Sequence, residues 1–213
     1  MEQALDGEGG RKYGKLSRMS GVGVNGFDLV VCNFAVHYMM NDYDSLHSFL
    51  QNVKENLVHK GYFIGSCLDG EEILKALKDD SKIEGYYKSS SSSKKSKSKS
   101  KSSKSNKLIW SIEKVDKSKK LFEDDFIGQR ISVYMDTFYE PTEENLVHID
   151  FLAEEALNYN LKLVDTKLFI DKQDNLFNDY KKEKSDYHKK IEENDAVKQW
   201  TSFQRWFIFQ KID

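Results

Sequence analysis

Residues 27–69, FDLVVCNFAVHYMMNDYDSLHSFLQNVKENLVHKGYFIGSCLD, decide the fold. The run Phe27–Cys32 is short and mostly apolar, which is typical of a strand buried in a parallel sheet. From Tyr43 to Leu57, apolar residues recur at spacings of three and four, which predicts a helix with one face on the core. Tyr62–Cys67 is again strand-like, so the stretch predicts one β-α-β unit.

Polar residues mark the ends of the predicted elements. Asn41 or Asp42 can cap the start of the helix, and Lys60-Gly61 is expected to mark its end. Both strands end in polar residues, Asn33 after the first and Asp69 after the second. Because open α/β sheets bind ligands beyond the carboxyl ends of their strands, we expect a functional site at this edge.

The rest of the chain predicts a mixed α/β domain. Two alternating segments separated by a charged connection predict an antiparallel hairpin, and a short helix precedes them. The short helix is expected at Glu71–Lys78 and the two hairpin strands at Leu108–Val115 and Gln129–Tyr139. After them we expect a helix at Asp150–Asn158, a strand at Leu161–Phe169, one or two charged surface helices in Leu176–Lys198 and a final antiparallel strand at Phe203–Ile212.

Composition narrows the class of protein. A length of 213 residues suits one domain, and a net charge of -2 gives no global basic field for nucleic acid, so any RNA contact must be a local patch. Apolar runs long enough for a membrane span and a signal peptide are both missing from the sequence. Cys32 and Cys67 are expected to be reduced core thiols, and the scattered histidines predict no metal site.

Two low-complexity segments flank this pattern. Residues 1–26 are rich in glycine but have no preceding strand, so a flexible leader is favoured over a nucleotide-binding loop. Residues 89–107 consist of serine, lysine and one asparagine, and with no apolar residue to bury they are predicted to be disordered. This tract is a tolerated insertion, a cationic tether for RNA or an arm tuned by phosphorylation.

The motif FDLVVCNFAVHY, followed by a helix and GYFIG, resembles the mRNA cap (guanine-N7) methyltransferases, especially those of large DNA viruses. The resemblance continues through GQRISVYMDTF, ENLVHIDFLAEEALNYNLKLV and RWFIFQK. It implies a Rossmann-like class I methyltransferase fold that uses S-adenosylmethionine to methylate the 5′ cap guanine. In that family a strand, a glycine-rich loop and an acidic residue hold the cofactor, and they precede the Phe27-type strand; this main cofactor-binding half is not found in the sequence.

The resemblance also implies site residues. The cap guanine pocket would be formed by five side chains: His37, Tyr38, Glu144, Trp206 and Leu68. The residues expected to approach the cofactor are Asn33, Phe34 and Tyr38. Guanine N7 carries a lone pair at neutral pH, so no catalytic acid or base is expected, and the reaction depends on proximity and alignment.

Each of these residues has a structural alternative. His37 can be a hydrogen-bonded histidine at a strand end, Phe34 and Tyr38 can be ordinary core aromatics, Glu144 can be a solvated loop charge, and Trp206 can simply pack in its strand.

The domain prediction is a flexible leader at residues 1–26 and a partial cap methyltransferase domain at residues 27–213. Three situations fit: a truncated copy, one subunit of a split enzyme whose cofactor half is a separate polypeptide, or a non-catalytic cap-binding or scaffold subunit of a capping enzyme. The expected partners are the capped RNA 5′ end and other capping-enzyme subunits, with no membrane contact. The expected location is intracellular, in a nucleus or a cytoplasmic viral factory, and not secreted.

Overall fold

A computed structural model of the chain describes residues 21, 23–78, 80–87, 106–117, 121–123, 125–171 and 194–213. Most of the predicted leader and the Ser/Lys tract up to Ser105 lie outside the described residues. The same holds for residues 176–193 of the predicted surface helices. The domain boundaries drawn from the sequence therefore remain predictions.

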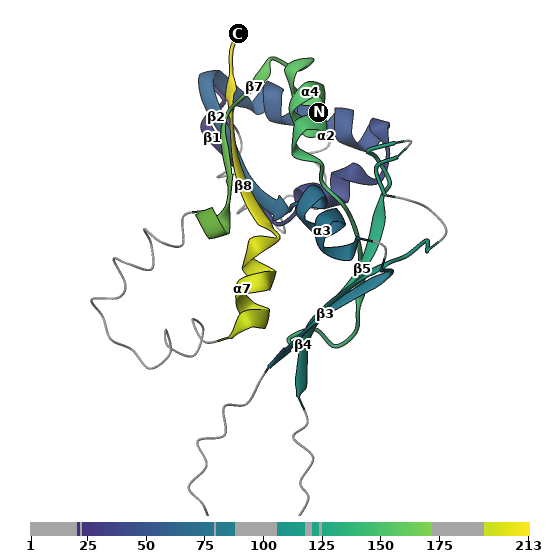
Figure 1. The fold of residues 1–213 in the computed structure, drawn as a ribbon. Coiled ribbons are helices and arrows are strands. Elements are labelled where there is room, and N and C mark those ends of the chain that lie inside the picture. The colour runs from purple at the N-terminus through teal and green to yellow at the C-terminus, as the bar shows by residue number, and fades with distance from the viewer. Residues whose placement is uncertain are drawn as a thin grey trace, which may run out of the picture.

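The first sheet has four strands in the order β1-β2-β8-β7. β1 (Phe27–Asn33) runs parallel to β2 (Leu57–Leu68), whereas β8 (Gln204–Lys211) is antiparallel to both of its neighbours, β2 and β7 (Leu161–Leu168). The final strand of the chain is therefore inserted inside the sheet, as Figure 1 shows. Both β1 and β2 point their carboxyl ends at one edge of this sheet, where a ligand site is expected.

Two helices cover one face of this sheet (Figure 1). α2 (Tyr43–Asn56) begins where the Asp42 side chain accepts a hydrogen bond from the Ser45 backbone N–H at 2.7 Å, and it buries Leu46, Leu50 and Val53. α4 (Ile149–Leu157) packs beside it. Three phenylalanine rings of the sheet, Phe63, Phe207 and Phe209, fill the core below them, with ring centroids 5.3–5.7 Å apart.

β1 lies at the edge of the sheet and contains no buried residue, so the prediction that Phe27–Cys32 is a buried strand is wrong. Among the described residues it pairs only with β2. Leu29 and Val31 are 48% and 52% exposed, and Tyr62, the register partner of Leu29, is 43% exposed. An apolar strand with an open edge and an open face is a surface on which other polypeptide can pack.

The second sheet is antiparallel and carries its own hydrophobic cluster. Its strand order is β3-β4-β5-β6, and the Trp110 ring lies buried at its centre beside Phe203, with centroids 5.6 Å apart. α3 and α7 pack on it (Figure 1). The bounds are α3 (Gly70–Leu77), β3 (Lys82–Tyr87), β4 (Lys107–Lys114), β5 (Arg130–Met135), β6 (Thr142–Asn145) and α7 (Asp195–Ser202).

The predicted β-α-β unit, the antiparallel hairpin and the antiparallel final strand are confirmed. The predicted helix end at Lys60-Gly61 is wrong, because α2 ends at Asn56 and β2 already begins at Leu57. The second hairpin strand is also shorter than predicted, since β5 ends at Met135 and the Phe138 N–H closes a turn onto the Met135 carbonyl at 2.8 Å.

Candidate functional site

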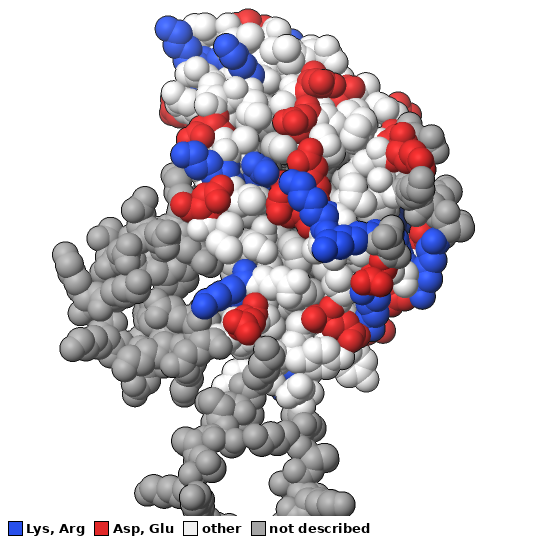
Figure 2. All heavy atoms as spheres, in the orientation of Figure 1, with Lys and Arg blue, Asp and Glu red and all other residues white. Residues whose placement is uncertain are grey.

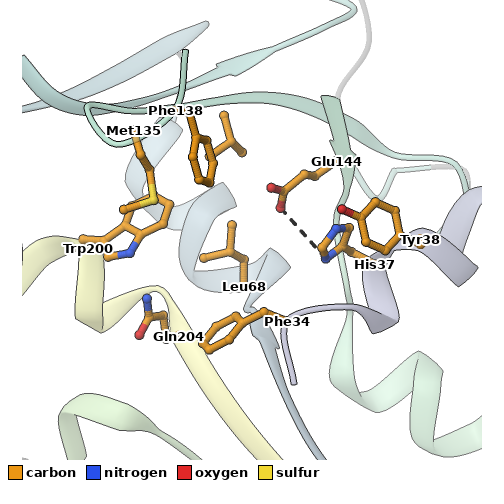
Figure 3. Close-up of a pocket in the computed structure, with 10 residues that line it drawn as sticks. Phe34, His37, Tyr38, Leu68, Met135, Phe138, Glu144, Trp200 and Gln204 are labelled. Carbon is orange, nitrogen blue, oxygen red and sulfur yellow. Dashed lines mark ion pairs between the residues drawn. The ribbon is translucent and has the colours of Figure 1, made fainter. Parts of the chain in front are cut away.

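A pocket of about 360 Å³ opens between the two sheets, at the carboxyl ends of β1 and β2 (Figure 3). Its walls combine aromatic and aliphatic side chains with three polar ones. The lining residues are Phe34, His37, Tyr38, Leu68, Val133, Met135, Phe138, Glu144, Trp200 and Gln204. Such a lining, apolar with few polar groups, is typical of sites for planar organic ligands.

Phe34 forms the turn that leaves β1. Its backbone has φ +50°, a left-handed conformation that is rare for a bulky residue, and its N–H donates to the Ser66 carbonyl at 2.8 Å. The turn brings the ring to the pocket, where it is 42% exposed. Unfavourable backbone geometry of this kind concentrates at functional sites.

His37 and Tyr38 follow on the 3₁₀ helix η2 (Val36–Asn41). Their rings lie against each other, with centroids 4.1 Å apart, but their exposure differs: His37 is 8% exposed and Tyr38 is 65% exposed. One ring is thus fixed in the pocket wall, while the other presents a face at the mouth.

Glu144 on β6 faces His37 across the pocket, with 4.0 Å between Glu144 Oε2 and His37 Nδ1 (Figure 3). Both side chains are largely buried, at 18% and 10% exposure. Burial raises the pKa of the Glu144 carboxyl and lowers the pKa of the His37 imidazole, because a charged form loses hydration in this pocket. His37 Nε2 and Asn145 Oδ1 are buried and have no hydrogen-bond partner among the described residues.

The structure brings together most of the residues that the sequence singled out for the cap pocket. His37, Tyr38, Glu144 and Leu68 line it, and so does Phe34, which was assigned to the cofactor. It does not bring Trp206 there. Trp206 is the register partner of Ser66 and lies two residues beyond the pocket end of β8. Gln204, two residues earlier on the same face of β8, is the register partner of Leu68 and lines the pocket beside it.

Five lining residues were missed by sequence reasoning: Val133, Met135, Phe138, Trp200 and Gln204. Gln129–Tyr139 was predicted as one continuous alternating strand, but β5 ends at Met135 and a turn precedes Phe138. Trp200 lies on the short helix α7, with its ring 5.8 Å from that of Trp110. The sequence signal that could have found Trp200 is a large aromatic side chain in a segment, residues 195–202, with few other apolar residues.

Asn33 lies beside the pocket but does not line it. Its Oδ1 atom accepts a hydrogen bond from the Ser66 hydroxyl at 3.3 Å, which ties the ends of β1 and β2 together. Asn33, Phe34 and Tyr38 are all exposed at the carboxyl end of β1.

Charges near this site are of mixed sign. Figure 2 shows Lys and Arg side chains interspersed with Asp and Glu on the visible face, and the lining of the pocket includes neither Lys nor Arg. In the described parts of the chain, no cluster of His, Cys, Asp and Glu has the arrangement of a metal site. Helices within those same ranges are too short or too polar to cross a membrane.

Most of the chain is similar in sequence to known proteins. The family model for the mRNA (guanine-N(7))-methyltransferase domain matches residues 19–202. A probable mRNA-capping enzyme of Acanthamoeba polyphaga mimivirus is 30% identical over 162 residues, which is 74% of this chain and 12% of that protein. An mRNA cap guanine-N(7) methyltransferase of Caenorhabditis briggsae is 41% identical over 56 residues, which is 26% of this chain and 15% of that protein.

The fold is thus α/β, of the Rossmann-like class I methyltransferase type. The chain belongs to the mRNA (guanine-N(7))-methyltransferase domain family. It spans less than a fifth of the length of either relative. Among solved structures, the CcbJ methyltransferase from Streptomyces caelestis aligns with a TM-score of 0.48 and 14% identity over 90% of this chain and 59% of that one, and the family assignment does not depend on it.

Proposed function

We propose that this chain binds the guanine of an RNA 5′ cap and presents its N7 atom for methylation by S-adenosylmethionine. One observation carries the proposal: Glu144, His37 and the exposed ring of Tyr38 meet in a single pocket at the carboxyl ends of β1 and β2. Because the chain spans a small part of its relatives, the activity is a proposal for this chain and not a transfer from them.

The polar groups suit the edge of a guanine. A carboxylate accepts hydrogen bonds from the N1–H and N2–H groups of guanine together, which adenine cannot offer. Glu144 is the carboxylate of the pocket, and the His37 ring lines the wall beside it, with Nδ1 4.0 Å from Glu144 Oε2.

The chemistry needs no general base, since N7 already carries its lone pair. The protein contributes to the rate by holding the base in line with the methyl donor and by excluding water. The aromatic residues Phe34 and Tyr38 suit both tasks, because an aromatic face attracts the positive charge that the ring gains when N7 is methylated.

S-adenosylmethionine supplies the methyl group when bound. The exposed rings of Phe34 and Tyr38 fit its sulfonium cation, and the Asn33 side chain adds polar atoms at the same strand end. We place the cofactor against these three residues. The described chain contains no glycine-rich loop between a strand and a helix that would hold the rest of the cofactor.

A second polypeptide segment is therefore part of the proposal. The open edge of β1 and the exposed side chains of Leu29 and Val31 offer it a strand to pair with and an apolar face to cover. This segment would carry the remaining cofactor contacts and would bring basic groups for the cap triphosphate, which the pocket lining lacks. Since caps are made where transcripts are made, the proposal places the protein inside the cell, in a nucleus or a viral factory.

The alternative function is a non-catalytic cap-binding or scaffold subunit of a capping enzyme. It is favoured by the observation that the described residues form a pocket lined by Glu144 and aromatic rings but no glycine-rich loop between a strand and a helix. Both functions require guanine binding, and they differ in whether a methyl donor binds next to it.

Calorimetric titration separates these cases. The full chain is titrated with the cap dinucleotide GpppG, with the guanine-free dinucleotide ApppA and with S-adenosylhomocysteine. We expect GpppG to bind more tightly than ApppA, since only guanine satisfies the Glu144 carboxylate. Equal affinities, or no binding of GpppG, would overturn the proposed base site. S-adenosylhomocysteine binding to the chain alone would remove the need for a second polypeptide, whereas its absence would support that need.

A further inference from the structure

A buried ion pair between Asp69 and Arg205 joins the end of β2 to the start of β8. The Arg205 Nε–H group donates to Asp69 Oδ2, with Asp69 1% exposed and the Arg205 side chain 16% exposed. A second guanidinium nitrogen, Nη1, lies 3.5 Å from the Thr166 hydroxyl on β7. The pair thus connects the last residues of one strand to two neighbouring strands of the same sheet.

Asp69 is also where the two sheets meet. Its second carboxylate oxygen accepts from the Glu72 N–H at 2.8 Å and caps α3, and its own N–H donates to the Phe203 carbonyl at 2.7 Å. Asp69 forms an isolated parallel bridge with Val147, and the Gly70 N–H donates to the Val147 carbonyl at 2.9 Å. One residue therefore fixes β2, β8, α3 and the segment that follows β6.

Two of these elements, β2 and β8, carry pocket-lining residues next to the pair, and β6 carries a third lining residue just before Val147. Leu68 precedes Asp69, Gln204 precedes Arg205, and Leu68 and Gln204 are register partners that face the pocket together. Glu144 lies three residues before Val147. The Asp69–Arg205 pair is not itself in the pocket lining, so any effect on a ligand must pass through these neighbours.

We propose that Asp69 and Arg205 are positioning residues, which hold Leu68, Gln204 and Glu144 at the distances that the pocket ligand requires. The inference rests on the proposed function for the identity of the ligand. It adds that affinity for the base depends on a contact outside the pocket. A displacement of binding groups by about 1 Å can reduce their effect by up to about a hundredfold.

The test separates positioning from stability. Arg205→Met alone leaves the buried Asp69 carboxylate without its charged partner and is expected to lower both the melting temperature and the affinity. The double variant Asp69→Asn/Arg205→Met removes both charges and keeps an oxygen to cap α3, so it is expected to fold. We expect its melting temperature to recover and its Kd for GpppG to rise about tenfold or more.

Two further variants complete the design. Arg205→Lys keeps the charge but not the two-pronged contact with Asp69 and Thr166, and we expect its Kd for GpppG to rise by a smaller factor than in the double variant. Glu155→Gln is the matched control, because it breaks the 2.7 Å contact between His47 and Glu155, which joins α2 to α4 away from the pocket. It should leave GpppG affinity unchanged.

Two outcomes would overturn the inference: wild-type GpppG affinity in both Arg205→Lys and the double variant, or a double variant whose Gln204 amide and Trp200 indole NMR signals coincide with those of the wild type. The NMR comparison needs no ligand, so it decides the inference even if the wild-type chain fails to bind GpppG. That failure would count against the proposed function alone.

Discussion

Replacement of Glu144 by glutamine should weaken guanine binding and stabilise the free protein at the same time. The side chain is 18% exposed in the pocket, so its carboxylate has lost most of its hydration before a ligand arrives. Glutamine keeps the shape of glutamate but replaces one acceptor oxygen by an N–H₂ donor, which would meet the N–H donors of guanine. Hydrogen bonds to a charged group contribute about 1.5–3 kcal/mol each. The loss of one of them corresponds to a rise in Kd for GpppG of about 10- to 150-fold.

The stability effect has a defined pH dependence. Burial raises the pKa of Glu144 above 4.5, so in the wild type the carboxyl is most favourable when protonated, and stability declines as the pH rises through the raised pKa. The glutamine variant lacks this decline. Its melting temperature relative to the wild type should therefore increase as the pH rises from about 4.5 through the raised pKa and should stay constant above it. His37, which faces Glu144, has a pKa lowered by burial and stays neutral in the upper part of this range.

Calorimetry with GpppG and ApppA, together with thermal melts across this pH range, measures both effects. Glu143→Gln is the control. Glu143 is the preceding residue on β6, its side chain is 54% exposed and it pairs with Arg130 at 2.8 Å on the other face of the strand. The control should alter stability by less than about 1 kcal/mol and leave affinity unchanged. Unaltered GpppG affinity in Glu144→Gln, or a melting-temperature difference that does not grow with pH, would refute the reasoning.

Three more predictions concern the walls and the core. Trp200→Ala should raise the Kd for GpppG about two- to tenfold in calorimetry, since an aromatic contact contributes about 0.5–1.5 kcal/mol, and an unchanged Kd would remove Trp200 from the ligand site. Gly65→Ala should lower the unfolding free energy by about 1–3 kcal/mol or more in urea titrations, because the added methyl group would overlap the Cys32 carbonyl and the Phe207 ring. Phe63→Ala should cost about 3–5 kcal/mol in the same assay, since the Phe63 side chain is fully buried; a loss below 1 kcal/mol would contradict the core assignment.

Local patterns in the sequence were sufficient for the β-α-β unit. The apolar stripe of α2 packs on the core, so its periodicity reflects the fold directly. The apolar run of β1 predicted a strand correctly but not its exposure, since only Val30 and Cys32 pack on that core. β6 was not predicted, because its four residues, Thr-Glu-Glu-Asn, contain no apolar alternation. Its strand conformation comes from pairing with β5, which a local pattern does not contain.

Only part of the pocket was predicted, because some of its walls depend on pairing between distant strands. His37, Tyr38 and Glu144 lie in recognisable motifs, whereas Trp200 and Gln204 reach the pocket only through the insertion of β8 beside β2. Trp206 was expected in the pocket, but Gln204, two residues earlier on β8, lines it instead, because the residue at the pocket end depends on where the strand begins. That position is set by the contact of Phe203 with Asp69, and residues so far apart in sequence give no shared local signal.

The two hydrophobic clusters have a consequence for how the protein unfolds. One cluster lies between the first sheet and the helices α2 and α4, and the other surrounds Trp110 in the second sheet. Each sheet is therefore stabilised largely by its own hydrophobic contacts. A ligand in the pocket touches η2 on one side and Trp200 and Met135 on the other. A bound ligand would therefore couple the unfolding of the two sheets. Hydrogen exchange in both sheets should slow together upon binding, although the ligand contacts only their facing edges.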